Sequence, residues 1–127
     1  MIRRRSNISS YVTKDGSRIW ELFHPESSPV KDVSTAEALV EAGQETETHV
    51  HRKSQEIYYI LEGSGDMRLG SKTMAVVSGD VVLIPPGMRH SIKNTDTKIL
   101  RILCICSPPY SHVDTELDLP EGSTGAP

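Results

Sequence analysis

Apolar and β-branched residues occur along the chain in short runs, most of them closed by glycine, proline, asparagine or aspartate. In residues 17–23 (SRIWELF), polar and apolar residues alternate with the period of two expected of a half-buried strand. The pattern predicts strands over residues 9–13, 17–23, 35–41, 57–62, 66–69, 72–77, 80–84, 90–93 and 98–106. Short strands whose turns recur every roughly 8–12 residues favour an all-β sandwich or barrel.

The turn residues predict how some of these strands connect. Asp15-Gly16 is a strong β-hairpin signal between the first two strands, and Gly63-Ser64-Gly65 predicts a second hairpin. Ser78-Gly79 marks a further turn. Residues 81–84 are apolar throughout, which indicates a strand buried on both faces. Residues 35–41 have some helical propensity, but the run is too short for a full helical period, so we predict a strand.

Length and C-terminal composition predict one domain. A chain of 127 residues is long enough for a single domain with a real core. We expect residues 1–119 to form this domain, with residues 107–119 as an extended arm lying over it. We predict that residues 120–127 form a flexible tail. The basic run Arg3-Arg4-Arg5 is interpreted as a solvated tail, with a contact to an anion as the alternative.

Net charge and hydropathy argue against nucleic-acid and membrane partners. The net charge is −3 with acids and bases mixed, which argues against a nucleic-acid partner. No apolar stretch reaches the ~18 residues of a membrane span, and no signal peptide is visible, so we expect a cytoplasmic protein without a membrane partner.

Cys104 and Cys106 would point to one face of a strand with Cβ atoms about 6.6 Å apart, too far for an unstrained disulfide. We interpret them as small buried apolar residues, with a redox pair or a thiol close to a metal as alternatives.

Three histidines and a glutamate have the spacing of a metal site. His49 and His51 are two residues apart, so on a strand they point to the same face. Glu56 follows at an odd offset and rejoins them only if the intervening residues turn. His90 follows a Pro85-Pro86-Gly87 corner that ends one strand before the next begins. All four side chains would then lie near strand ends, around one mouth of a barrel.

The chemistry of this donor set selects a class of metal. Three imidazoles and one carboxylate suit Fe, Mn, Co, Ni, Cu or Zn better than Ca or Mg, which prefer oxygen. Four protein ligands leave up to two positions open on a six-coordinate ion, as a catalytic site needs. We therefore predict one divalent transition metal.

The two stretches that carry these residues resemble the two sequence motifs of the cupin superfamily. The first spans residues 43–63 and the second residues 79–94, and together they contain the motif positions Gly43, His49, His51, Glu56, Gly63, Gly79, Pro85, Gly87, His90 and Asn94. The resemblance implies a double-stranded β-helix, or jelly roll, with His49, His51, Glu56 and His90 as metal ligands. It also implies a homodimer.

Strand alternation predicts what surrounds the metal. Tyr58 shares the face of Glu56 and is the candidate acid or base, with an ordinary core tyrosine as the alternative. Ile60 and Ile92 would form the apolar end of the pocket. Residues 98–106 have two registers: in the favoured one Leu100, Ile102, Cys104 and Cys106 face inward and Arg101 faces solvent. In the other, Arg101 enters the pocket as a carboxylate clamp.

These features favour a metal-dependent enzyme, a dioxygenase, isomerase or lyase, that acts on a small polar organic molecule. One alternative is a non-catalytic domain that binds or senses a small molecule. Another is a metal that only stabilises the fold. The jelly roll does not choose among reactions, because one barrel hosts many chemistries.

Overall fold

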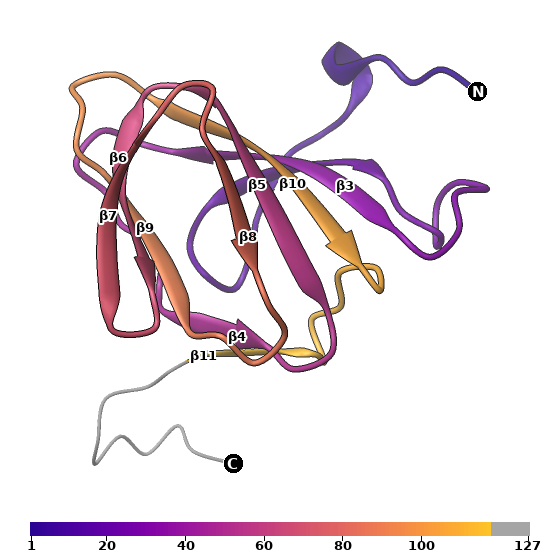
Figure 1. The fold of residues 1–127 in the computed structure, drawn as a ribbon. Helices are drawn as coiled ribbons and strands as arrows, with labels where there is room; N and C mark the ends of the chain where they lie inside the picture. The colour runs from indigo at the N-terminus through magenta and orange to yellow at the C-terminus, as the bar shows by residue number, and fades with distance from the viewer. Residues whose placement is uncertain (118–127) are drawn as a thin grey trace.

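Two antiparallel sheets packed face to face form the protein (Figure 1). The computed structural model describes residues 1–117 of the 127, so the predicted tail, 120–127, lies outside the described residues. The elements are η1 (Arg5–Asn7), β1 (Tyr11–Val12), β2 (Arg18–Phe23), β3 (Ser34–Val40), β4 (His49–His51), β5 (Gln55–Glu62), β6 (Ser64–Leu69), β7 (Lys72–Val77), β8 (Val81–Ile84), β9 (His90–Asn94), β10 (Leu100–Ser107) and β11 (Thr115–Leu117). No helix among these residues is long and apolar enough to cross a membrane.

The sheet order confirms the predicted all-β jelly roll. One sheet has six strands in the order β1-β2-β3-β10-β5-β8, and the other has five in the order β11-β4-β9-β6-β7. From β4 to β10, most successive strands alternate between the two sheets, as a double-stranded β-helix requires. The side chains that face inward make one core, and its fully buried apolar members are Ile60, Met67, Ile84, Ile92, Leu100 and Ile102.

The hairpin predicted at Gly63-Ser64-Gly65 is wrong. β5 pairs with β10 and β8, whereas β6 pairs with β7 and β9, so the chain crosses there from one sheet to the other. Gly63 has a φ of 92°, and a Cβ on it would lie 2.6 Å from the Ile99 carbonyl oxygen. A glycine signal identifies a turn, but it does not tell whether the flanking strands pair or part.

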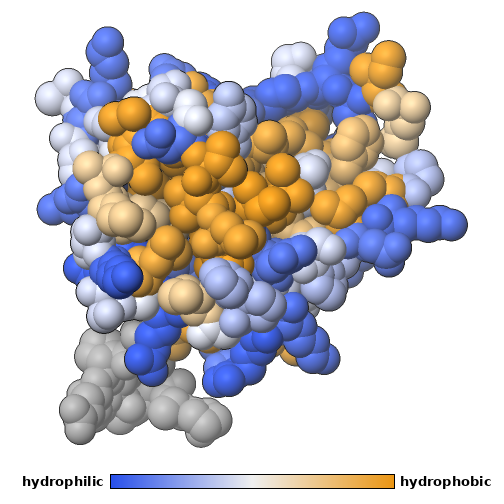
Figure 2. Space-filling model, in the orientation of Figure 1, coloured by the Kyte–Doolittle hydropathy of each residue, from blue (hydrophilic) through white to orange (hydrophobic). Residues whose placement is uncertain are grey.

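The prediction that residues 81–84 are buried on both faces is also wrong. Val82 and Ile84 are buried, but Val81 is 65% exposed and Leu83 is 58% exposed, because they point to the outer face of the sheet, which nothing covers among the described residues. On the neighbouring β5, Tyr59 and Leu61 also face outward. Together these side chains contribute to an apolar surface over the outer face of the six-stranded sheet (Figure 2).

The favoured register of β10 is confirmed, and the N-terminal arginines have partners. Arg101 lies outside the barrel, where its guanidinium pairs with Glu37 and Glu62, so it does not enter the pocket.

Arg5, from the N-terminal arginine run, donates to the same Glu37 carboxylate and stacks over the Trp20 ring at 3.7 Å. The interpretation of the arginine run as a solvated tail is therefore wrong for Arg5 and also for Arg3, whose guanidinium donates to the carbonyl oxygens of Glu21 and Leu22 on β2.

The C-terminal arm follows the barrel along its mouth. Its β11 pairs with β4, the strand of the first two histidines. The Lys14 ammonium, from the turn between β1 and β2, donates to the carbonyl oxygens of His112 and Thr115 at 2.8 and 2.9 Å. The hydroxyls of Thr13 and Tyr110 are hydrogen-bonded at 3.0 Å. The N-terminal hairpin and the arm therefore hold each other over one end of the barrel.

Candidate metal centre

β4 presents two imidazoles to the barrel interior. His49 and His51 are buried with the partly buried Val50 between them, as the alternation of a strand requires. Their ring centroids lie 5.0 Å apart. The predicted shared face of the two histidines is therefore present.

A turn brings Glu56 back beside these histidines. Residues 52–54 reverse the chain, and Glu56 is the second residue of β5. Its Oε1 lies 3.1 Å from His51 Nε2. The Asp114 carboxylate of the arm accepts hydrogen bonds from the backbone N–H groups of Lys53 and Ser54 and so fixes the turn.

The Pro-Gly corner delivers the third histidine. β8 ends at Ile84 and β9 begins at His90. Gly87 has a φ of 78°, which a side chain would disfavour, and its N–H donates to the His51 carbonyl oxygen at 2.7 Å. His90 is fully buried, pairs across the ladder with His49, and places Nε2 3.5 Å from Glu56 Oε1.

The remaining motif positions are structural. Gly43 and Gly79 also have positive φ angles, 75° and 96°. Asn94 is fully buried, and its amide donates to the carbonyl oxygens of Val40 and Lys98 while its Oδ1 accepts from the Asp96 N–H. These contacts fix the turn between β9 and β10.

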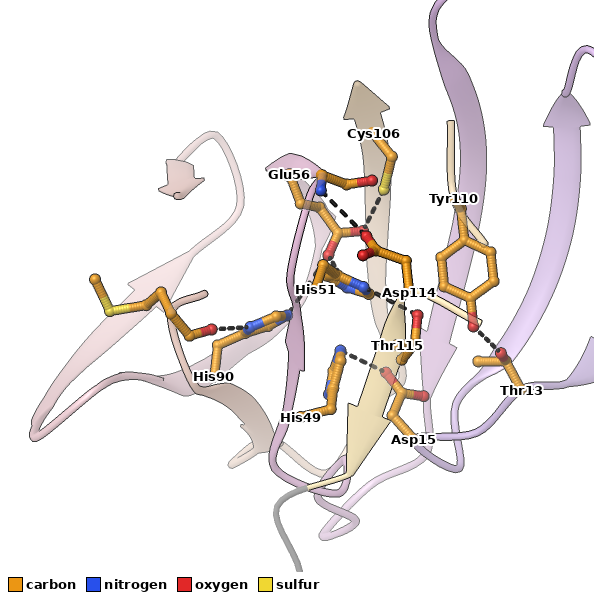
Figure 3. Close-up of polar contacts among 12 residues, drawn as sticks. Thr13, Asp15, His49, His51, Glu56, His90, Cys106, Tyr110, Asp114 and Thr115 are labelled. Atoms are coloured by element: carbon orange, nitrogen blue, oxygen red, sulfur yellow. Dashed lines mark hydrogen bonds and ion pairs between the residues drawn. The ribbon is translucent and has the colours of Figure 1, made fainter. Parts of the chain in front are cut away.

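The four candidate ligands meet at one point (Figure 3). One donor atom from each of His49, His51, Glu56 and His90 lies within 4.8 Å of the others, and all four residues are buried. Such a group could hold a metal ion.

Hydrogen bonds at Nδ1 fix the state of all three imidazoles. Backbone carbonyl oxygens accept from His49 and His90, those of Glu47 at 2.8 Å and Met88 at 2.9 Å. His51 Nδ1 lies 3.0 Å from the Thr115 hydroxyl, which itself donates to the Ser111 carbonyl oxygen and so accepts from the histidine. Because each Nδ1 donates to a fixed acceptor, each ring directs Nε2 toward the shared point, as metal-binding histidines do.

The Nε2 atoms of His51 and His90 face a position that a cation would fill. Among the described residues, His90 Nε2 is buried without a hydrogen-bond partner. His51 Nε2 and Glu56 Oε1 are only 3.1 Å apart, a distance that requires either a proton or a metal ion between two atoms that otherwise both accept. The residues therefore fit a bound metal by their donor types, burial and orientation.

The electrostatics agree with a cation site. Burial raises the pKa of Glu56, but its contacts with His51 and His90 outweigh burial and lower that pKa to about 2. Burial, with the nearby His90, lowers the pKa of His49. A permanent carboxylate and an imidazole that resists protonation both favour a metal ion over protons at neutral pH.

A cavity adjoins the cluster, and three of the four candidate ligands, His49, His51 and Glu56, line it. It has room for roughly three to five water molecules. The predicted pocket residues Ile92, Ile102 and Cys104 line it, whereas Ile60 is fully buried in the core and is not part of its wall. The cavity is also lined by Ile19, Ala38, Val40, Cys106 and Tyr110.

Tyr58 lies in the cavity wall, on the face predicted for it. Its ring centroid is 6.1 Å from that of His90. Burial, and then the charge of Glu56, raises the pKa of Tyr58 well above its usual range, so the phenol keeps its proton. Its neighbour Tyr59 is partly exposed on the outer face.

Both cysteines are free and buried. The Cys106 thiol lies 3.1 Å from Glu56 Oε2 and donates to it, so this side chain supports a candidate ligand. Burial, and then the charge of Glu56, raises the pKa of Cys106. A neutral thiol of this kind is a hydrogen-bond donor rather than a reactive nucleophile.

Four residues near the ligands were not identified from the sequence as part of the site: Asp15, Tyr110, Asp114 and Thr115. Asp15 was visible only as a hairpin residue. Asp114 and Thr115 lie on the arm, where no spacing relates them to the histidines. Their contacts depend on how the arm returns to β4, which the local sequence does not specify.

Known proteins share this sequence and fold. The cupin domain family matches residues 36–106, more than half of the chain. An uncharacterised protein of Methanocaldococcus jannaschii is 49% identical over 110 residues, which cover 87% of this chain and 88% of that protein. An oxalate-binding protein of Thermotoga maritima is 36% identical over 63 residues, which cover 50% of this chain and 52% of that protein.

A solved structure gives the same result. The crystal structure of a predicted oxalate decarboxylase from Thermotoga maritima superposes with a TM-score of 0.75 at 28% identity, covering 85% of this chain and 99% of that one. Residues 36–106, which match the cupin domain family, include every strand from β4 to β9, and hence all four candidate ligands. With its two motifs, its jelly roll and its His₃Glu cluster, the chain belongs to the cupin family.

Proposed function

We propose that the protein is a metal-dependent enzyme that acts on a small polar organic molecule, with one divalent transition metal held by His49, His51, Glu56 and His90. The observation that carries this proposal is the set of three Nε2 lone pairs, each fixed through Nδ1, that meet a carboxylate oxygen at the wall of a cavity. A metal held there would supply Lewis-acid or redox chemistry.

The donor set suits Fe, Mn, Co, Ni, Cu or Zn. Four protein donors leave up to two positions on a six-coordinate ion, and the cavity gives a small molecule access to them. Dioxygenation, isomerisation and elimination all fit such a site, because the fold itself does not select a reaction.

The side chains of the cavity wall have distinct roles in this proposal. Tyr58 presents a protonated phenol, so it would donate a hydrogen bond or a proton to the bound molecule. Ile92 and Ile102 would exclude water from the reacting atoms. Cys106 and Thr115 would hold Glu56 and His51 in their binding orientations.

A second candidate is a cupin that binds a small molecule without turning it over. The similarity to an oxalate-binding protein of Thermotoga maritima favours it. A metal that only stabilises the fold is a weaker candidate, since the cluster opens onto a cavity rather than into packed side chains.

Metal content and turnover separate these candidates. The protein would be purified without a chelating tag, its metals measured by mass spectrometry, and oxygen uptake and product formation followed over a panel of small acids and diketones. Iron with oxygen uptake would identify a dioxygenase, and turnover without oxygen uptake an isomerase or lyase. Ligand binding without turnover would support the second candidate. Protein that holds no metal, either as purified or after reconstitution, would contradict the proposal.

Tyr58→Phe supplies a matched control. This variant keeps the ring and removes only the hydroxyl, so we expect metal content to stay the same while turnover falls about 10²-fold or more. Unchanged turnover would remove Tyr58 from the mechanism but leave the metal site in place.

A further inference from the structure

The cavity contains a carboxylate that does not belong to the cupin motifs. Asp15 lies in the turn between β1 and β2, is only 8% exposed, and lines the same cavity as His49, His51 and Glu56. Its Oδ2 is 3.8 Å from His49 Nε2 (Figure 3). A molecule that binds beside that ligand atom therefore meets the Asp15 carboxylate.

The orientation of this carboxylate is fixed from two sides. Asp15 Oδ1 accepts hydrogen bonds from the Ser17 N–H at 2.9 Å and the Ser17 hydroxyl at 2.6 Å. The Asp15 carbonyl oxygen accepts from the Glu47 N–H at 2.8 Å, which ties the turn to the segment before β4. Oδ1 is thus held by the turn, and Oδ2 is directed toward the metal centre.

The charge of the cavity wall is one-sided. Asp15, Glu21 and Glu56 line it, and none of the lining residues in the described part of the chain is lysine or arginine. Lys14 is next to Asp15 in sequence, but its ammonium donates to the carbonyl oxygens of His112 and Thr115 on the arm. A divalent ion would offset the carboxylates of Asp15 and Glu56, and Glu21 leaves the wall negative, so the site offers a dianion little attraction.

We infer that Asp15 determines the ligand selectivity of this site: it favours a neutral molecule that offers an O–H or N–H group to Oδ2 and disfavours a dicarboxylate. This inference rests on the proposed function, since it assumes that a ligand approaches a metal held by the four residues. It separates the protein from relatives that are named for oxalate, a dianion.

A matched pair of probes tests the inference. Malonate and malonamide have the same skeleton and two chelating oxygens, but malonate is a dianion, whereas malonamide is neutral and offers N–H groups. Protein loaded with Co(II) would be titrated with each probe, and the visible Co(II) absorption would report binding. Asp15→Asn is the test variant, because its side-chain oxygen can still accept the hydrogen bonds from Ser17.

We expect Asp15→Asn to bind malonate at least about tenfold more tightly than the wild type, and malonamide more weakly, because its N–H groups lose the Oδ2 acceptor. Affinity for Co(II) alone should fall by a similar factor, because the same charge attracts the ion, so malonate is titrated at saturating Co(II). Glu21→Gln is the control, since it removes one charge from the same cavity wall without touching the group beside His49. It should change malonate binding by less than about twofold.

Several outcomes would overturn the inference. Malonate affinity in Asp15→Asn no better than in the wild type would do so, as would an equal gain in Glu21→Gln. Complete loss of Co(II) binding in Asp15→Asn alone would make Asp15 a metal ligand instead. If the wild type does not bind Co(II), the proposed metal site is wrong and this inference falls with it. If the wild type binds Co(II) but Asp15→Asn gains no affinity for malonate, only this inference is wrong.

Discussion

The motif segment, residues 43–94, and the segments that flank it contribute different things to the metal centre. The motif segment supplies all four candidate ligands. The flanks supply the groups that orient them: Thr115 accepts from His51, Asp114 holds the turn before Glu56, and Asp15 faces His49. Ligand identity and the orientation of His49 and His90, held by the Glu47 and Met88 carbonyls, are therefore local in the sequence, while the orientation of His51 and Glu56 and the charge beside His49 come from the two ends of the domain.

The largest expected effect is the loss of a ligand from the motif segment. His90→Ala removes one of the four donors, so we expect metal affinity to fall beyond detection in a Co(II) titration while the circular dichroism spectrum stays that of a β protein. His112→Ala, a histidine of the arm, is the control and should keep full affinity. Metal occupancy in His90→Ala equal to that of the wild type would reject the ligand assignment.

Loss of a group from the flanks should weaken the site without abolishing it. Thr115→Val keeps the shape but cannot accept from His51 Nδ1, and the loss of such a partner costs roughly 10–100-fold in metal affinity. Thr115→Ser keeps the hydroxyl and should bind nearly as well as the wild type. If both variants bind metal equally, the arm does not orient His51, and the contrast between ligands and orienting groups is wrong.

Two crossover glycines allow a comparison of stability within the motif segment. Gly63 and Gly79 have similar positive φ angles, 92° and 96°, but a Cβ meets backbone 2.6 Å away at Gly63 and nothing within 4 Å at Gly79. Gly79→Ala should cost the strain of the backbone conformation, about 1–3 kcal/mol of unfolding free energy, and Gly63→Ala should cost more. Chemical denaturation measures both, and equal losses would mean that the close contact relaxes freely.

Acid should weaken the metal-free fold through the motif segment. The pKa of Glu56 is lowered from 4.5 to about 2, so its contribution to stability is present above about 4.5 and is lost as the pH falls toward 2. The pKa of His49 is also lowered, so below about 6.5 the unfolded chain binds the proton more readily. Unfolding free energies measured between pH 7 and 3 should therefore fall with acid, and Glu56→Gln should flatten the lower part of the curve. An identical curve for Glu56→Gln would contradict this assignment.

The sequence was most informative where one local pattern determines the outcome. Strand alternation predicted the shared face of His49 and His51, the inward Tyr58 and the outward Arg101, since side-chain direction depends only on position within a strand. The hairpin predicted at Gly63 and the burial predicted for Val81 are wrong, because strand pairing and the covering of a sheet's outer face are properties of the whole fold. The homodimer and the cytoplasmic location stay predictions.

The site also shows the limit of motif spacing. His49, His51, Glu56 and His90 carry a recognisable spacing, and the structure brings them together. Asp15 and Thr115 reach the same place from opposite ends of the domain, 100 residues apart in sequence, and no short pattern encodes that approach. Function that depends on such groups can be inferred only once the fold is known.

The hydrogen bond from His51 to Thr115 has a consequence for biosynthesis. A nascent chain carries all four ligands once residue 90 has been made, but the acceptor that orients His51 arrives 25 residues later, with β11. A chain cut within the arm, before Thr115, would keep all four ligands and the central strand β10 but lack this acceptor, so it should hold a metal ion less tightly. Full orientation of His51 therefore requires residue 115 to have paired with β4, long after the ligands themselves have been made.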